Sequence, residues 1–289
     1  MFTEDQIMIR DAARAFAQGE LAPGALERDR TGKPPLDLLR QMGELGLMGM
    51  TVDEKWGGAG TDFVSYVLAL MEIAAADGAV STIMSVNNSP CCAALSRYGN
   101  DEQREQWLKP MASGEIIGAF CLTEPQAGSD ASALKTRAVR DGDDWVINGT
   151  KQFITSGSIG GVALVFAVTD PAAGPKGISA FLVPTDSPGF EIQRIIRMFG
   201  SVGGDEAEVV LEDVHVEPWQ LVGELGQGFD AAKYGVSIGR IYNSARSVGT
   251  GRWAIEQALE YARDCYTRRS EGVSIWVVKS SDICASQED

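Results

Sequence analysis

The sequence predicts an α+β fold in three parts: an N-terminal helical domain, a central antiparallel β-barrel-like domain, and an incomplete C-terminal helical bundle. Apolar residues recur with helical spacing in the first part, alternate with polar residues in the second, and return to helical spacing in the third. The length of 289 residues is enough for more than one hydrophobic core. We therefore expect domains over residues 1–118, 119–222 and 223–289.

The N-terminal part contains helix signals in order. Thr3 and Gln6 have the spacing of a capping box, in which each side chain accepts a hydrogen bond from the other residue's backbone N–H. Apolar residues at helical intervals follow, and Gly19 with Pro23 is expected to end this helix. Further helices are expected over residues 36–45, 63–76 (capped by Asp62), 79–98, and after a cap at Asn100.

The central part reads as strands. The dipeptides Asp141-Gly142 and Asn148-Gly149 are interpreted as two hairpin turns within residues 138–155. Other strands are expected over residues 162–168, 178–183, 190–196 and 207–216. Helical spacing returns after Gly226, in a helix expected to end near residue 264. A polar tail with a short strand-like run over residues 275–278 follows.

Composition excludes several classes of protein. The net charge of −15 at pH 7 argues against a general nucleic-acid or anionic-membrane binder, because either would need a basic face. A single histidine, His215, excludes zinc sites built on several histidines, and no metal site is predicted. The odd number of cysteines without CxxC spacing indicates a reducing compartment. With no signal peptide and no apolar run long enough to span a bilayer, we expect a cytoplasmic protein.

The most specific segment is Phe120–Asp130, where the first strand leaves the helical part and enters a turn rich in small and hydroxyl residues. Backbone N–H groups and the hydroxyls of Thr123 and Ser129 suit a polar planar ligand or a phosphate. Glu124 is interpreted as a structural residue at the turn before Pro125, because one carboxylate without a partner does not indicate acid–base chemistry.

A second segment, residues 151–157, brings Phe153 and Thr155 together near the end of a strand. An aromatic ring beside a hydroxyl donor suits an isoalloxazine ring, which is flat, apolar in its body and hydrogen-bonding at its edge. The glycine-rich pieces at residues 57–60 and 226–228 do not follow strands in a βαβ unit, so a Rossmann site is not predicted.

Four motifs in register resemble the acyl-CoA dehydrogenase family over roughly residues 3 to 263: residues 122–130, 145–157, 209–218 and 225–229. The resemblance implies FAD as cofactor, an acyl-CoA substrate, an electron-transferring flavoprotein as partner, and a homo-oligomer. It also implies a role in fatty acid or amino acid catabolism.

Site residues are carried over where the motif matches. The resemblance implies a cofactor site made of Phe120, Cys121, Leu122, Thr123, Gly128, Ser129, Phe153, Ile154 and Thr155. Thr123 would lie on the ring, and residues 153–155 would cover it near N5. Substrate contacts are implied for Ser129, Arg240 and Ser237, and more loosely for Thr169.

The implied reaction is α,β-desaturation, in which a carboxylate base removes the α-proton and the β-hydrogen passes as hydride to flavin N5. In some members of the family the base is a glutamate immediately before the matching arginine, where this chain has Gly239. In the others it lies late in the third domain. We therefore expect no catalytic base in these residues and an inactive or impaired enzyme. The departure from the family after about residue 264 is interpreted as a truncation or an altered reading frame.

Two alternatives remain open. One is a non-catalytic subunit or binding fragment that pairs with a complete homologue. The other is a flavin oxidase or monooxygenase of the same fold, which would keep the cofactor site and change the chemistry.

Overall fold

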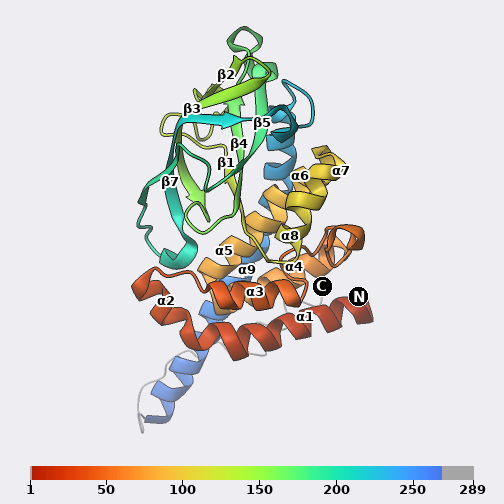
Figure 1. Ribbon diagram of the computed structural model, residues 1–289. Coiled ribbons are helices and arrows are strands. Elements are labelled where there is room, and N and C mark those ends of the chain that lie inside the picture. Colours follow the sequence, from red (N-terminus) through yellow and green to blue (C-terminus); the bar gives the residue numbers. More distant parts are fainter. Residues whose placement is uncertain (1, 269–289) are drawn as a thin grey trace. The chain divides into compact units, whose positions relative to one another are not determined.

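The computed structural model describes residues 2–268, and side chains as far as residue 263. The chain divides into two compact units, residues 1–250 and 251–289. Within the first unit the strands gather at one end and helices α1 and α3 lie at the other, with α5 between them (Figure 1). The strand-like run expected at residues 275–278 lies outside the described residues.

The N-terminal part is helical, as the periodicity predicts. Its helices are α1 (Glu4–Phe16), α2 (Ala25–Thr31), α3 (Leu36–Glu44), α4 (Phe63–Ala76), α5 (Gly78–Val86), α6 (Ala93–Tyr98), α7 (Asp101–Gln103) and α8 (Lys109–Ala112). Helix α9 (Gly228–Arg268) follows the strands. The capping box is formed, with Gln6 N 3.2 Å from Thr3 Oγ1 and Thr3 N 3.0 Å from Gln6 Oε1. Asp62 and Asn100 cap their helices, and so confirm the assignments.

Three helix ends differ from the expectation. The first helix does not end at Gly19 but continues as a π-helical turn over Ala17–Leu21. It changes to a 3₁₀ turn over Ala22–Gly24, which contains Pro23. The stretch expected as one helix over residues 79–98 is interrupted at Ser89, whose φ and ψ are −153° and 118°. Proline disfavours the helical conformation of the residue before it, and Pro90 follows Ser89. Helix α9 extends to Arg268 rather than ending near residue 264.

The central part is one sheet. Its strands are β1 (Gly118–Cys121), β2 (Arg137–Asp141), β3 (Asp144–Thr155), β4 (Val162–Val168), β5 (Ile178–Pro184), β6 (Phe190–Ile195), β7 (Glu206–Val216) and β8 (Leu221–Val222). Their order is β6-β7-β3-β2-β4-β5-β8, with β1 beside β4. The strands expected at residues 162–168, 178–183, 190–196 and 207–216 therefore form within about one residue of their predicted ends.

The barrel-like, antiparallel expectation needs correction. Among the described strands, β6 and β8 lie at the two ends of the order and do not pair with each other, so the sheet is open. Strand β1 runs parallel to β4, with Gly118 opposite Val162, and β2 also meets β4 in parallel. Alternation of apolar and polar residues identifies a strand and its buried face, but it does not encode the direction of a neighbour reached through a long connection.

Asn148-Gly149 is not a turn. It lies inside β3, at a register shift between Ile147 and Gly149 where β3 faces β7. The Asn148 side chain bridges to Asp213 of β7, donating to Asp213 Oδ1 at 3.0 Å and accepting from Asp213 N at 2.9 Å. A Cβ on Gly149 would lie only 2.7 Å from the Thr136 Cβ. The glycine therefore serves close packing rather than a reversal of the chain.

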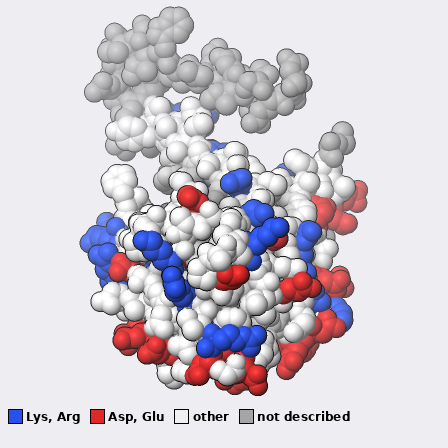
Figure 2. All heavy atoms as spheres, turned by 90° about the horizontal axis from the view of Figure 1, so that it is seen from above, with Lys and Arg blue, Asp and Glu red and all other residues white. Residues whose placement is uncertain are grey.

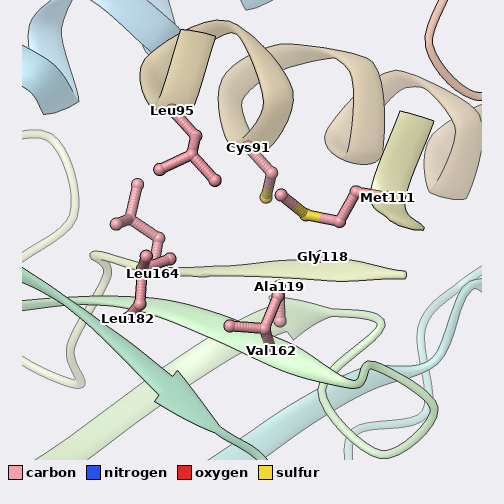
Figure 3. Close-up of a pocket in the computed structure, with 8 residues that line it drawn as sticks. All are labelled: Cys91, Leu95, Met111, Gly118, Ala119, Val162, Leu164 and Leu182. Atoms are coloured by element: carbon pink, nitrogen blue, oxygen red, sulfur yellow. The ribbon is translucent and has the colours of Figure 1, made fainter. Parts of the chain in front are cut away.

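Three apolar clusters hold the first unit together: one inside the helical layer, one within the curled sheet, and one between the two. Tyr242 of α9 belongs to the helical cluster and meets Tyr66 edge-on, with ring centroids 4.1 Å apart. The beginning of α9 is thus part of this unit. Where the helices around residues 91–111 meet the sheet, apolar side chains including Cys91, Met111 and Leu164 surround a cavity of about 10 Å³ (Figure 3). A void of that size with apolar walls holds no ligand.

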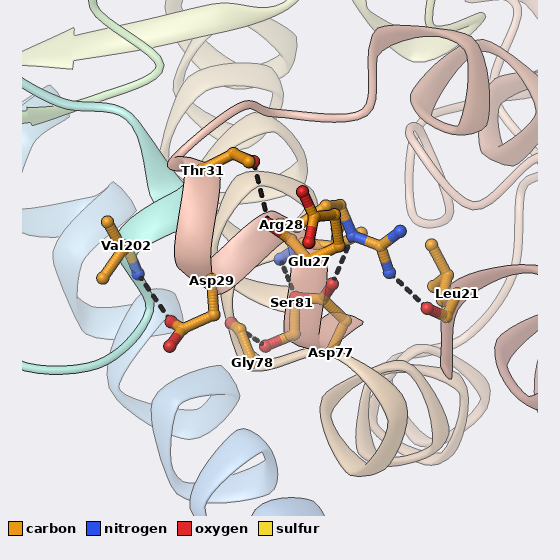
Figure 4. A network of polar contacts seen from close by, with 10 residues as sticks. Leu21, Glu27, Arg28, Asp29, Thr31, Asp77, Gly78, Ser81 and Val202 are labelled. Carbon is orange, nitrogen blue, oxygen red and sulfur yellow. Dashed lines mark hydrogen bonds and ion pairs between the residues drawn. The ribbon is translucent and has the colours of Figure 1, made fainter. Parts of the chain in front are cut away.

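A polar network ties α2 and α5 to the loop before β7 (Figure 4). The Arg28 guanidinium pairs with Asp77 at 2.8 Å, and both side chains are largely buried. Asp29 accepts a hydrogen bond from Val202 N at 3.3 Å. Ser81 of α5 accepts from Arg246 Nε of α9 at 2.9 Å, so the same region also holds α9. These contacts fix the position at which β7 begins.

The surface carries charges of both signs. On the face seen in Figure 2, lysines, arginines and carboxylates are interspersed rather than segregated. That face offers no continuous basic area of the kind that binds nucleic acid. Among the described helices, none is long and apolar enough to cross a membrane.

Candidate active site

A cleft of about 570 Å³ lies between the loop after β1 and the first turns of α9. Its volume is in the range of small-molecule and cofactor sites. Six of the residues predicted from the sequence line it: Leu122, Thr123, Gly128 and Ser129 from the loop, and Ser237 and Arg240 from the helix. Two segments that are far apart in the chain are therefore brought together at one site.

A buried ion pair shapes the loop. Lys151 is fully buried, and its Nζ donates to Glu124 Oε1 at 2.8 Å and to Leu122 O at 3.3 Å. Glu124 also accepts from the backbone N–H groups of Lys135 and Thr136 at 2.6 and 2.9 Å. Burial alone would raise the pKa of Glu124, but Lys151 and these donors outweigh it and hold that pKa at about 2. Glu124 is a structural anchor of the turn, as the sequence suggested.

A bulge re-aims the chain beside this loop. The pairing of β3 with β7 jumps between Lys151 and Ile154, which leaves Gln152 and Phe153 as the bulged residues. Phe153 has a φ of 57° and its side chain is 50% exposed. Gln152 N donates to Thr123 O at 2.9 Å, so the bulge lies directly beside Thr123. An aromatic ring held outward at this point has no role in the core.

The Thr155 hydroxyl, at the end of β3, contacts a carboxyl group that sequence reasoning missed. Thr155 Oγ1 lies 3.0 Å from Oε1 and 2.9 Å from Oε2 of Glu206. Burial raises the pKa of Glu206 to about 7, although the hydrogen bond from Thr155 lowers it. The only signal in the sequence is an acidic residue at the start of a strand, opposite Thr155 in the register that the structure reveals.

Other predicted residues lie near the site without facing it. The side chains of Cys121 and Ile154 are buried in the sheet, so only their backbone is available to a ligand. Burial raises the pKa of the Cys121 thiol to about 12, which makes it unreactive. Phe120 packs on Phe166, with ring centroids 4.8 Å apart. The Thr169 hydroxyl donates to Gly177 O within a loop of the sheet rather than lining the cleft.

Comparisons with known proteins identify the family. The family models described as the N-terminal and middle domains of acyl-CoA dehydrogenase match residues 3–115 and 119–214. An "Acyl-CoA dehydrogenase" of Bacillus subtilis is 40% identical over 261 residues, which are 90% of this chain and 69% of the relative. The chain belongs to the acyl-CoA dehydrogenase family. A relative from Clostridium acetobutylicum, described as short-chain specific, is 36% identical over 97% of this chain and 75% of its own length.

Solved structures share the fold. A chain from the structure described as "Electron transferring flavoprotein of Acidaminococcus fermentans" superposes with a TM-score of 0.92 and 38% identity, covering 99% of this chain and 75% of that one. A glutaryl-CoA dehydrogenase from Mycobacterium smegmatis, in complex with FADH2, gives a TM-score of 0.86 at 33% identity, covering 99% and 70%.

The end of the chain matches a different family. The model described as "Phenylacetic acid degradation B" matches residues 251–289. A shifted reading frame would not reproduce the sequence of a known family, so this match argues against an altered frame. The chain carries segments recognised by models of two different families, and the segment that matches the second family begins within α9.

Proposed function

We propose that the cleft between the loop after β1 and α9 binds FAD and an acyl-CoA, and that the reaction it serves is α,β-desaturation of the acyl group. The observation that carries the proposal is the convergence of Thr123 and Ser129 with Ser237 and Arg240 on one cleft. The residues fit a flavin: an outward aromatic ring, a hydroxyl at Thr155 and backbone groups lie side by side at the bulge. When bound, FAD supplies the ring that accepts hydride.

The protein's own groups then have distinct tasks. Phe153 presents an apolar face against which a flat ring can stack, while Thr123 and Thr155 offer hydrogen bonds to its polar edge. Ser129 and Arg240 both line the cleft, and their hydroxyl and guanidinium groups suit an anionic, phosphate-bearing substrate. Short acyl chains are the substrate class we favour, because a relative described as short-chain specific aligns over nearly the whole chain.

Chemistry by these 289 residues is expected to be slow. Gly239 stands where some members of the family have the glutamate base, and it is exposed enough that a Cβ there would meet no atom within 4 Å. No carboxylate is therefore available at that position to take the α-proton, and general-base catalysis contributes about 10²–10⁴-fold to such rates.

The experiment mixes the FAD-loaded protein anaerobically with acyl-CoAs of increasing chain length and follows bleaching of the visible flavin band. We expect slow bleaching that is fastest with short chains, and faster bleaching in Gly239→Glu. Ser244→Ala, on the same helix outside the cleft, is the control. Rapid return of the flavin band when oxygen is admitted, or bleaching by substrates that lack a thioester, would instead favour an oxidase or monooxygenase.

A non-catalytic subunit is the second candidate, favoured by one observation. Ile241 and Val248 are 58% and 56% exposed and lie seven residues apart on one face of α9, which suits contact with another chain. Co-purification with a longer homologous chain would support this role.

We further propose that electrons leave to an electron-transferring flavoprotein. The reason is that a related chain comes from an Acidaminococcus fermentans structure whose description names such a protein. We also propose that the protein is a homo-oligomer and that it is located in the cytoplasm. The free thiols of Cys91, Cys92 and Cys121 agree with a reducing compartment.

A further inference from the structure

Glu206, the first residue of β7, places a carboxyl group directly behind the Thr155 hydroxyl. Both of its carboxyl oxygens lie within hydrogen-bond distance of Thr155 Oγ1, at 3.0 and 2.9 Å. A hydroxyl carries one proton, so Thr155 donates to one acceptor at a time. If Thr155 donates its proton to Glu206, it can only accept a hydrogen bond from a ligand on its other side. If Glu206 does not take that proton, Thr155 can donate it to the ligand.

The charged groups around Glu206 leave its protonation open to change. Asp205, its neighbour in the chain, is held by Ser158, whose N and Oγ lie 2.8 and 2.6 Å from the Asp205 carboxyl oxygens. Arg246 of α9 is the nearby cation, and its guanidinium donates to Ser81, Thr82, Gly78 and Asn243. Within the described residues, Arg246 forms no ion pair with Glu206, so no cation fixes Glu206 in its ionised form.

Burial of Glu206 also favours the protonated form of its carboxyl group. It raises the pKa of the carboxyl to about 7, and the neighbouring Asp205 adds to the increase, whereas Thr155 and Arg246 oppose it. Both forms of the carboxyl group are therefore accessible near neutral pH. The protonated carboxyl group can donate to Thr155, whereas the ionised carboxylate can only accept from it.

We propose that Glu206 is a positioning residue that sets the direction of the Thr155 hydrogen bond at the flavin ring, and that it loses its proton to solvent when the flavin is reduced. This inference rests on the proposed function, in which Thr155 covers the ring near N5. Protonated Glu206 donates to Thr155 Oγ1, which leaves the Thr155 proton free for N5 of the oxidised ring, an acceptor. A reduced ring would carry a hydrogen at N5 and would present a donor there. Thr155 then accepts from N5 and donates its own proton to ionised Glu206.

The test is the midpoint potential of the bound flavin as a function of pH, from about pH 6 to about pH 8. If reduction releases the Glu206 proton, the protein takes up fewer protons per two electrons near neutral pH. The potential should then depend less steeply on pH in this window in the wild type than in Glu206→Gln, which cannot ionise.

Variants of the partner residue sharpen the test. In a Thr155→Val background, adding Glu206→Gln should no longer change the slope, because the hydroxyl that links the carboxyl to the ring is gone. Thr155→Ser keeps that hydroxyl and should restore the effect of Glu206→Gln. Glu208→Gln, on the same strand and paired with Arg194, should behave as the wild type.

The outcomes separate two failures. Identical slopes in the wild type and Glu206→Gln would overturn the inference and leave the flavin site intact. A steeper slope in the wild type would also overturn it, because simple repulsion between a carboxylate and the reduced ring gives that sign. A wild-type chain that retains no flavin contradicts the proposed function, and the inference with it.

Discussion

At the scale of residues, the site depends on one buried charge pair. Lys151 and Glu124 are 0% and 2% exposed in their side chains, and together they join the loop after β1 to β3. Such a pair adds little net stability relative to apolar residues, but loss of one partner leaves a buried charge without compensation. Its value here is positional, since the Lys151 ammonium also binds Leu122 O and Phe166 O.

Lys151→Met is expected to lower the free energy of unfolding by about 3–5 kcal/mol, because it leaves the Glu124 carboxylate buried alone. Adding Glu124→Gln should recover a large part of the loss. Lys109→Met, which removes an exposed pair with Glu105, is the control and should cost less than about 1 kcal/mol. Denaturant titration measures all of these. A small effect of Lys151→Met would show that Glu124 is not left as an uncompensated buried charge.

The pKa of Glu206 gives a second residue-scale prediction. Because burial raises this pKa from 4.5 to about 7, the folded protein holds a proton that the unfolded chain has already lost between these values. The free energy of unfolding therefore falls as pH rises through this range. Glu206→Gln should be more stable than the wild type by on the order of 2 kcal/mol at about pH 8, and equally stable near pH 4. Equal stability at the higher pH would show that the carboxyl is not perturbed.

At the scale of elements, the helices and strands followed from periodicity and caps, whereas their local irregularities did not. The capping box at Thr3 and the strand over residues 162–168 depend on neighbours in the sequence, and both were predictable. The bulge at Phe153 and the close packing of Gly149 depend on β7 and Thr136, which lie far away in the chain. The same reason hid Glu206, whose partner is known only once the register is known.

Gly149→Ala tests the packing interpretation. The new methyl group would press on Thr136, so we expect a loss of about 1–3 kcal/mol in the free energy of unfolding. Gly19→Ala is the matched control, because a Cβ there meets nothing within 4 Å and should stabilise the helical turn by about 0.5–1 kcal/mol. If both substitutions were stabilising, Gly149 would be an ordinary strand glycine.

At the scale of the whole molecule, the site exists because α9 returns to the loop after β1. The resemblance implied substrate contacts for Ser129 and Arg240, but only the fold brings the two residues to one cleft. The open sheet and its parallel pairing were beyond the sequence pattern, since connections rather than periodicity determine them. The chain spans 69% and 75% of the lengths of two acyl-CoA dehydrogenase relatives. Flavin binding and activity must therefore be measured on the 289-residue protein itself.

The most direct test of the flavin site is the visible absorption spectrum of the 289-residue protein after incubation with FAD and gel filtration. We predict a retained flavin band in the wild type. The band should weaken in Phe153→Ala, which removes the exposed ring, and should persist in Phe199→Ala, an exposed phenylalanine outside the cleft. A folded wild-type protein that leaves the column without flavin would contradict the central claim that the cleft and the bulge beside it form a flavin site.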